Sequence, residues 1–406
     1  MVNDVGFVSE IEGLYGPISV SELVIQKIWL RGEFRRNGLK TLCGKSIEVV
    51  YAGTWNRLGG PDFLKAELII GGKRVVGDVE VHFYLRDWLA HGHDENRAFD
   101  EVSLHVVVFD PQGGEKEIKR INGQVIPTLV LLPHLFEGIE EYALADALRC
   151  LTQRDPYDLA EGCLSMSQVD RREAFIERAG KRWAVKCNHA RRLLAGSGWE
   201  TACHLSVLGV LGYRRNRGTM VELGDTFPVS HWMADTEATL TRALEVFGEK
   251  WQLGGIRPAN APELRLRQYG ALFEHNVHWM ARLAGCLESI DFKGAGKEST
   301  RAYRKRSHLG QWRSWIRDEI LGKAIPVPRM DTVMIDAVLP LLAVSNPDTD
   351  LFPLWYHWNG GDLPAGLRRL LSVLELVNAE NPLSNGLQQG ALQRLIEERQ
   401  TVQVLD

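Results

Sequence analysis

Paired cysteines, long apolar runs and an excess of either charge are all missing from this sequence of 406 residues. Its six cysteines are scattered without a CxxC pair, which argues against a disulfide framework and for a reducing compartment. The longest apolar runs, such as residues 102–109, have the length of a strand, so we expect no membrane span. The polar residues 1–12 lack the apolar core of a signal peptide. Together these absences predict a cytoplasmic protein.

Several motifs that mark enzyme classes are also absent. The sequence has no GxGxxG, no P-loop and no GxSxG, so nucleotide-driven chemistry and a serine-hydrolase elbow lack support. Cys187 with His189, and Cys203 with His204, do not have zinc-finger spacing. With a net charge of −4, any surface for nucleic acid has to be local.

The length predicts two domains, and the first, over residues 1–135, is expected to be α/β. Ser19-Val20-Ser21-Glu22 has the pattern of a capping box, and an apolar stripe follows it, so a helix is expected there. Alternating or apolar runs then predict strands, interrupted by one short helical or loop piece at residues 85–90. The expected strands are residues 46–51, 63–70, 74–83 and 102–109, with a further candidate at 124–132.

Helical periodicity dominates residues 136–406, which we expect to form an all-α domain. No fixed repeat period is present. The predicted helical segments are residues 136–151, 169–194, 199–211, 233–247, 263–287, 300–321, 332–343 and 388–398.

The most informative stretch is a hairpin that carries charged side chains. Gly71-Gly72 predicts a two-residue turn that pairs residue 63 with 80 and residue 65 with 78. In that register one face is apolar and the other carries Lys65, Glu67, Asp78, Glu80 and His82. Asp62, next to Pro61 at the mouth of the hairpin, lies diagonal to Glu80 within one register step, and a one-residue bulge would decide its face.

Carboxylates crowded onto a strand need a reason, and binding of a divalent metal is the one that fits best. Asp62 and Glu80 supply the oxygen ligands that Mg²⁺ or Mn²⁺ takes. His82 is expected to act as a general base, or as a third ligand that favours Mn²⁺. Lys65 is a candidate for the catalytic cation.

A second group of polar residues follows the hairpin. Asp87 starts a run that contains His91, His93 and Asp94, and His105 lies in the next strand. These side chains either line the same cleft, bind a transition metal themselves, or only cap the local backbone. Glu22 and Glu33, expected on the first helix, are further candidate ligands, although Glu22 is also the acid of the capping box.

The pattern of Asp62 followed by Glu80-Val81-His82 resembles the signature of the PD-(D/E)XK, restriction-endonuclease-like superfamily. The order helix, three strands, helix, strand is similar to the core of that superfamily. The resemblance implies metal-dependent phosphodiester hydrolysis of DNA or RNA, with His82 in the place of the usual lysine. A degenerate fold that only binds nucleic acid or serves as a scaffold is the alternative.

A second resemblance covers most of the chain. Gly60-Pro61-Asp62-Phe63, the run from Gly77 to His82, and Asp87-Trp88 with His91-Gly92-His93-Asp94 are similar to a bacterial family, domain of unknown function 2851. Later pieces, such as Leu211-Gly212-Tyr213, are similar too. This family implies no activity.

The helical half contains basic runs with aromatic residues between them. Arginine beside aromatic side chains suits contact with phosphates and stacking on bases, whereas the bland alternative is a solvated helix face. The arginines expected to grip nucleic acid are Arg215, Arg217, Arg304 and Arg306. A protein partner or a homo-oligomer stays open, as does a transition-metal enzyme built on His91, His93 and His105.

Overall fold

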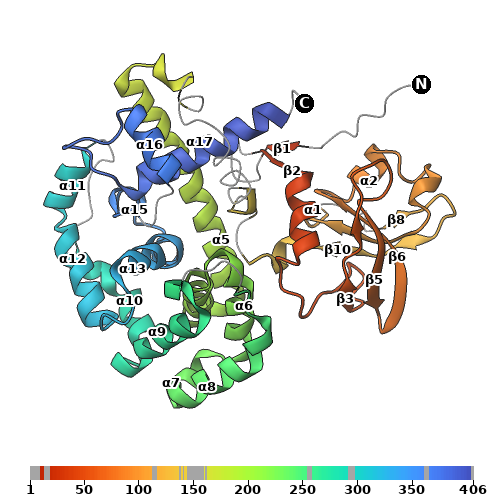
Figure 1. The fold of residues 1–406 in the computed structure, drawn as a ribbon, viewed down its shortest axis with the longest axis horizontal. Helices are drawn as coiled ribbons and strands as arrows, with labels where there is room; N and C mark the ends of the chain where they lie inside the picture. The colour runs from red at the N-terminus through yellow and green to blue at the C-terminus, as the bar shows by residue number, and fades with distance from the viewer. Residues whose placement is uncertain are drawn as a thin grey trace. The chain divides into compact units, whose positions relative to one another are not determined.

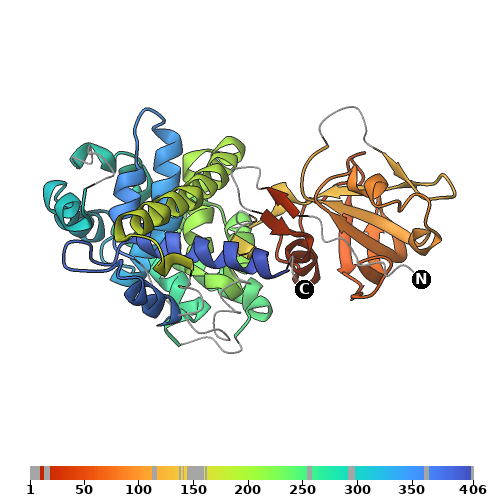
Figure 2. The same cartoon turned by 90° about the horizontal axis from the view of Figure 1, so that it is seen from above.

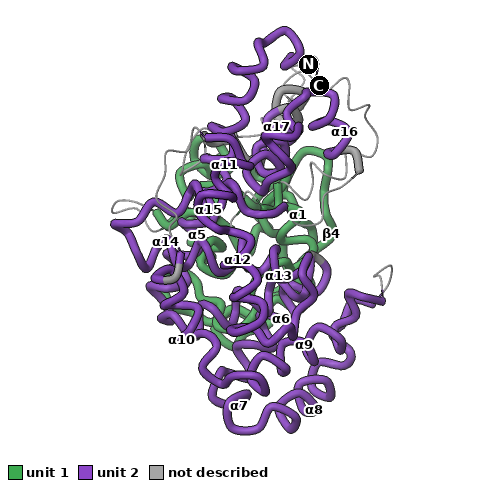
Figure 3. Tube along the Cα trace, turned by 90° about the vertical axis from the view of Figure 1, so that its left-hand side faces the viewer, with its two compact units in different colours: residues 1–146 green, residues 147–406 purple. Residues whose placement is uncertain are grey.

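The computed structural model describes residues 10–12, 19–111, 117–136, 139, 141–143, 160, 162–253, 258–290, 298–360 and 365–403. The chain forms two compact units, Met1–Asp146 and Ala147–Asp406, which are coloured separately in Figure 3. The expected division after residue 135 lies shortly before this one. No helix in the described ranges is long and apolar enough to cross a lipid bilayer.

Unit 1 contains a mixed β-sheet that curls into a half-barrel (Figures 1 and 2). Three strands form an antiparallel meander, and two further strands continue the sheet in parallel. In spatial order the strands are β10 (Thr128–Val130), β7 (Val102–Val107), β6 (Lys73–His82), β5 (Phe63–Ile70) and β3 (Ile47–Tyr51), with β4 (Thr54–Trp55) beside β5.

Short elements surround this sheet. Helix α1 (Glu22–Arg31) precedes β3 and packs on β6, while α2 (Asp87–Ala90) and the 3-10 turn η1 (Arg97–Phe99) make the crossover from β6 to β7. The remaining described elements are the strand pairs β1 (Glu10–Glu12) with β2 (Ser19–Ser21) and β8 (Ile118–Lys119) with β9 (Val125–Ile126), and the 3-10 turn η2 (Leu132–His134).

Burial follows from the position of each strand in the sheet. Every residue of β7 is buried, as expected for a strand with parallel neighbours and both faces covered. Trp29 of α1 is fully buried and stacks on Phe34 with ring centroids 5.5 Å apart. The apolar stripe predicted for the first helix is therefore the side that covers the sheet.

The hairpin of β5 and β6 has the predicted register near its turn but not at its mouth. Ala66 lies opposite Gly77, as expected from the Gly71-Gly72 turn. Farther out a β-bulge shifts the register, so that Phe63 lies opposite Val79 and the predicted pairing of 63 with 80 is wrong. Lys65, inside the bulge, has φ 55°, and its N–H donates to Asp78 Oδ1 at 2.9 Å. The extra residue moves Asp62 level with Glu80.

Gly77 lets β7 approach the hairpin closely. A Cβ at this position would lie 2.7 Å from the carbonyl oxygen of Glu101 and 2.8 Å from Cβ of Ser103. We expect Gly77→Ala to lower the free energy of unfolding of unit 1 by about 1–3 kcal/mol, because backbone has to shift to make room. Urea unfolding, monitored by tryptophan fluorescence, measures this loss of free energy of unfolding.

Gly180→Ala is the matched control for that substitution. A Cβ on Gly180, in the interior of helix α5, meets nothing within 4 Å. Alanine also has the higher helix propensity, so this variant should be no less stable than the wild type. Equal stability of Gly77→Ala and wild type would show that β7 does not pack against Gly77 as described.

Unit 2 is mostly helical, with α5 (Gln168–Leu211) and α17 (Asn385–Gln403) packed along each other (Figure 1). The helices expected at 169–194 and 199–211 run into each other through a kink at Gly198, which has φ 73° and ψ 176°. The prediction for 136–151 lies mostly outside the described residues. Among the described residues of this unit, three helices have no counterpart in the sequence prediction: α6 (Tyr213–Thr226), α15 (Phe352–His357) and α16 (Ala365–Val373).

The other described elements of unit 2 are short. They include two π-helical stretches, η6 (Ile316–Ile320) and η7 (Met334–Val338), each of which continues the α-helix before it. In chain order they are α7 (Val229–Ala234), α8 (Thr236–Phe247), η3 (Gly248–Lys250), η4 (Pro258–Asn260), α9 (Pro262–His275), α10 (Trp279–Ala284), η5 (Cys286–Ser289), α11 (Thr300–Arg306), α12 (Leu309–Trp315), η6 (Ile316–Ile320), α13 (Val327–Val333), η7 (Met334–Val338) and α14 (Leu339–Ser345).

Candidate metal centre

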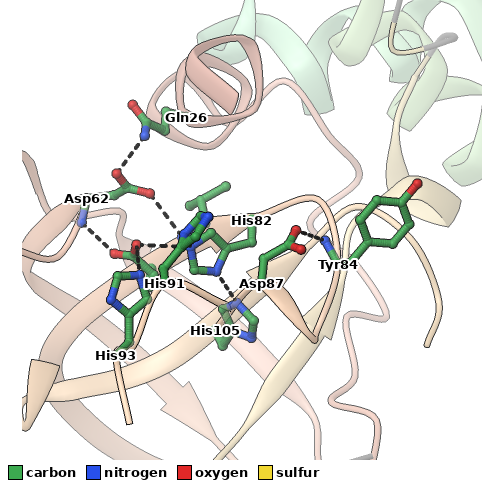
Figure 4. Close-up of polar contacts among 10 residues, drawn as sticks. Gln26, Asp62, His82, Tyr84, Asp87, His91, His93 and His105 are labelled. Atoms are coloured by element: carbon green, nitrogen blue, oxygen red, sulfur yellow. Dashed lines mark hydrogen bonds and ion pairs between the residues drawn. The ribbon is translucent and has the colours of Figure 1, made fainter. Parts of the chain in front are cut away.

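Two acidic side chains meet at the mouth of the hairpin. Because the bulge brings Asp62 level with Glu80, the Asp62 N–H donates to Glu80 Oε2 at 2.9 Å, and the N–H of Val81 donates to Asp62 Oδ2 at 3.0 Å (Figure 4). The two carboxylates thus come from neighbouring strands and lie side by side. Glu80 Oε1 is the oxygen that remains turned toward the histidines.

Two histidines lie on the same sheet face as Glu80. His82 is two residues farther along β6, and His105 of β7 is the parallel partner of Glu80. His82 Nδ1 lies 2.9 Å from His105 Nε2, and the other ring nitrogen, Nε2, lies 3.4 Å from Glu80 Oε1. One side of the His82 ring is therefore held by His105, and the other faces the carboxylate.

The turn after α2 adds two more imidazoles. His91 ends α2, and Gly92 continues the turn with φ 70°, a conformation that glycine adopts without strain. His91 Nδ1 lies 3.1 Å from His82 Nε2, and His93 Nε2 lies 3.4 Å from Glu80 Oε1. The His93 ring is packed against Phe99, with centroids 3.8 Å apart. One nitrogen each from His82, His91 and His93 thus lies within 4.8 Å of the other two.

These spacings are those of ligands that share one ion. Ligand atoms about 2.1 Å from a metal are about 3.0 Å apart at right angles and about 3.4 Å apart in a tetrahedron. The pairs His82 Nε2 to His91 Nδ1, His82 Nε2 to Glu80 Oε1, and His93 Nε2 to Glu80 Oε1 fall at 3.1, 3.4 and 3.4 Å. The three imidazoles fit one divalent metal, and Glu80, which lies next to His82 and His93 but outside the group that gathers within 4.8 Å, joins them only if side chains adjust.

Burial disfavours negative charge at this site. Burial, and then the neighbouring charge of Glu80, raise the pKa of the Asp62 carboxyl well above its usual range. Burial raises the pKa of the Glu80 carboxyl to about 8. Two neighbouring carboxylates, Glu80 buried and Asp62 half-buried, are costly to ionise together unless a cation lies beside them.

The imidazoles are held in their neutral form. Burial and the neighbouring histidines lower the pKa of His82 well below its usual range. Burial lowers the pKa of His93 to about 4 and that of the fully enclosed His105 to about 3. The pKa of His91, which is exposed, is lowered as well, again mainly by burial of part of its ring. Neutral imidazoles keep the lone pair that binds a metal.

Gln26 of α1 is a site residue that the sequence did not reveal. Its Nε2 donates to Asp62 Oδ1 at 2.6 Å (Figure 4), and the indole N–H of Trp55 donates to its Oε1 at 3.1 Å. Since an indole nitrogen only donates, it determines which end of the amide faces Asp62. The only signal in the sequence is a polar residue inside the apolar stripe of the first helix.

Several predicted site residues do not join this cluster. Lys65 is exposed in the bulge, although it was expected beside Glu80. Glu33 follows the end of α1 at Arg31, so its predicted place on the helix is wrong, and it forms a 3.7 Å ion pair with Arg31. Asp94 is half-buried and acts on His93 only through its charge.

Asp87 and the buried Glu22 are not in the group of converging ligand atoms, although the charge of Asp87 opposes the lowering of the His91 pKa. Asp87 accepts a hydrogen bond from the Tyr84 N–H at 2.8 Å, which is the capping role that was the alternative for this loop. Glu22 is the first residue of α1 and Ser19 lies in β2, so the predicted capping box, in which Glu22 would be the third helical residue, is wrong.

The arginines expected to bind nucleic acid differ in their surroundings. Arg304 donates to the carbonyl oxygens of His357, Trp358 and Leu383 at 2.8 to 3.1 Å, so its guanidinium links parts of unit 2 and is withdrawn from the phosphate-binding set. Arg306 is exposed and forms an ion pair with Glu298 at 2.7 Å. Arg215 is exposed and Arg217 half-buried. Tyr303 and Trp312, which alternate with these basic residues, are buried core side chains.

Comparison with known proteins gives one match. No curated protein and no solved structure matches the chain. A family model described as protein of unknown function (DUF2851) matches residues 22–249, which is more than half of the 406 residues and includes the whole histidine and carboxylate cluster. The chain belongs to this DUF2851 family.

Proposed function

We propose that unit 1 is a metal-dependent nuclease, which hydrolyses phosphodiester bonds of DNA or RNA. The observation that carries the proposal is the convergence of Asp62 and Glu80 at the bulged mouth of the hairpin, with Glu80 Oε1 turned toward neutral imidazoles. Buried acids beside metal-binding nitrogens are typical of catalytic sites and rare in purely structural cores.

The order of elements supports the same proposal. Helix α1 is followed by the antiparallel strands β3, β5 and β6, then by the α2 crossover and by β7, which runs parallel to β6. This is the order that the likeness to the PD-(D/E)XK superfamily implies. Asp62 immediately precedes the second of these strands, β5, and Glu80 lies on the third, β6, in the places that the likeness implies for metal-binding carboxylates.

Each residue has a distinct task in the proposed reaction. A divalent cation, Mg²⁺ or Mn²⁺ in the initial expectation, would activate water and offset charge on the phosphate, and Glu80 with His82 would hold it. Asp62, which Gln26 and the Val81 N–H hold in position, would orient the attacking water and accept its proton. His82 is neutral and therefore replaces the usual lysine as a ligand, not as a positive charge.

The rival function is a module with the same fold that only binds nucleic acid or a protein. The exposed position of Lys65 and the internal hydrogen bonds of Arg304 favour it, because both remove a cation from the proposed machinery. A transition-metal enzyme using His91, His93 and His105 is less well supported in that form, since His105 contacts the far side of His82.

A cleavage assay tests the proposal. The full-length protein would be incubated with labelled single- and double-stranded DNA and with RNA, in Mn²⁺, Mg²⁺, Zn²⁺ or EDTA. We expect strand cleavage that needs a divalent metal and stops in EDTA. Binding of these nucleic acids without cleavage in any of the metals would favour the rival function and end the nuclease proposal.

A further inference from the structure

We propose that the centre is a transition-metal site with three histidine ligands and one carboxylate, and that it discriminates against Mg²⁺. The ligand atoms would be His82 Nε2, His91 Nδ1, His93 Nε2 and Glu80 Oε1. His105 would be a positioning residue for His82. This inference concerns the site of the proposed nuclease, but it depends on metal binding alone and not on cleavage.

The surroundings of His93 point to a missing partner. Neither ring nitrogen of His93 has a hydrogen-bond partner within the described ranges, although both atoms are buried. An unsatisfied buried polar group costs about 1–3 kcal/mol, so buried histidines normally have a donor or acceptor beside them. Its Nε2 is 3.4 Å from Glu80 Oε1, which is long for a hydrogen bond but suits two ligands of one ion.

The chemistry of the ligands selects the class of metal. Imidazole nitrogen suits Mn²⁺, Fe²⁺, Co²⁺ and Zn²⁺, whereas Mg²⁺ prefers oxygen ligands in a regular octahedron and retains several waters. The three converging atoms are imidazole nitrogens, and Glu80 beside them adds one oxygen. A magnesium ion here would have to exchange water for nitrogen, which is unfavourable.

His105 determines which nitrogen of His82 is available. If His82 binds through Nε2, its proton is on Nδ1, which lies 2.9 Å from His105 Nε2 and donates to it. His105 must then carry its own proton on Nδ1, a buried atom that has no partner in the described part of the chain. Such outer-shell hydrogen bonds orient ligating histidines, and losing one typically weakens metal affinity about 10- to 100-fold.

Solvent can reach the centre from one side. His91 is exposed, His93 is half-buried, and His82 and Glu80 are buried beneath them. A metal at this position could therefore be loaded, and could keep an open coordination position toward Asp62, as catalytic metal sites do.

Metal binding to the untagged full-length protein, stripped with a chelator, tests the inference. We expect one transition metal per chain, with Mn²⁺ or Zn²⁺ bound at least about 100-fold more tightly than Mg²⁺ in calorimetry. His91→Ala, a change at an exposed residue, should weaken binding of Zn²⁺ at least tenfold, while His278→Ala, also exposed but in unit 2, should leave it unchanged.

Co²⁺ substitution tests the role of His105. The visible absorption spectrum of the bound Co²⁺ should change in His105→Leu, and the affinity should fall about 10- to 100-fold. His105→Gln offers an acceptor to His82 and should recover most of the affinity. Unchanged Co²⁺ spectra and affinities in both folded variants would remove His105 from the proposal.

The two proposals fail separately. Tight, stoichiometric binding of Zn²⁺ or Mn²⁺ without cleavage of any nucleic acid would end the nuclease proposal and support the metal site. Cleavage that proceeds equally well in Mg²⁺ and in His91→Ala would support the nuclease and overturn the histidine centre. Failure of the stripped, folded protein to bind a transition metal would also overturn it.

Discussion

Glu80→Gln is expected to lower metal-dependent cleavage by about 10³-fold or more, which corresponds to about 4 kcal/mol of activation free energy. Glu80 Oε1 lies 3.4 Å from both His82 Nε2 and His93 Nε2, so it is the carboxylate oxygen among the proposed ligands, and a bound cation would favour its ionised form. Glutamine has nearly the same shape and can still accept the hydrogen bond from the Asp62 N–H. The substitution therefore removes the charge that holds and tunes the metal while leaving the hairpin intact.

Initial rates in Mn²⁺ and in Zn²⁺, together with the metal affinity, measure this effect. Glu48→Gln is the matched control, because Glu48 is exposed on β3 of the same sheet. It should retain wild-type rates. If Glu80→Gln cleaves as fast as Glu48→Gln, Glu80 takes no part in the chemistry, and the assignment of the centre fails with it.

Asp331→Ala is expected to destabilise unit 2 by about 3–5 kcal/mol, because it breaks a buried ion pair and leaves the partner charge behind. Asp331 lies in α13 and accepts two hydrogen bonds from Arg313, both at 2.6 Å, and a third from the indole N–H of Trp358 at 3.1 Å. The Asp331 side chain is 5% exposed and that of Arg313 22%. In the variant, water can therefore replace only part of the hydrogen bonding that the Asp331 carboxylate gives to Arg313 and Trp358.

Denaturant unfolding of unit 2 measures this loss, and the chain offers a control of the same chemistry. Asp318 also forms a two-pronged ion pair with an arginine, Arg317, but this pair lies at the surface. Exposed ion pairs contribute little, so Asp318→Ala should leave the unfolding midpoint unchanged. Equal midpoints for Asp331→Ala and Asp318→Ala would contradict the description of Asp331 as a buried carboxylate that accepts three hydrogen bonds.

Local patterns were sufficient to predict the longer strands of unit 1 and the turn of its central hairpin. Gly71-Gly72 defines a tight turn, and that turn alone determines that Ala66 faces Gly77. The apolar stripe from Val24 to Trp29 predicts a helix, and α1 buries that stripe. Such signals arise within a few residues, so they can be read without tertiary information.

The ligand set was only partly predictable, because some of its members meet only through the packing of elements that are distant in the sequence. Glu80 and His82 stand out as polar residues on an expected strand, and Asp62 as an acid directly before one. The roles of His91 and His93 depend on how the turn after α2 folds back onto β6, and Gln26 reaches Asp62 only because α1 covers the hairpin. Arg304 could be recognised as basic, but its carbonyl partners come from residues more than 50 positions away.

By itself, the sequence determined which segments form helices or strands and their order in unit 1. It also determined that acids and imidazoles suited to a metal are present. Periodicity, turn chemistry and side-chain type are local properties, so they can be read from the sequence. The tertiary structure decided which of these groups meet. The bulge at Lys65 moved Asp62 by one residue step, and the crossover placed His93 beside Glu80 and His91 beside His82. Proximity between distant residues depends on how whole elements pack, so no local pattern in one sequence contains it.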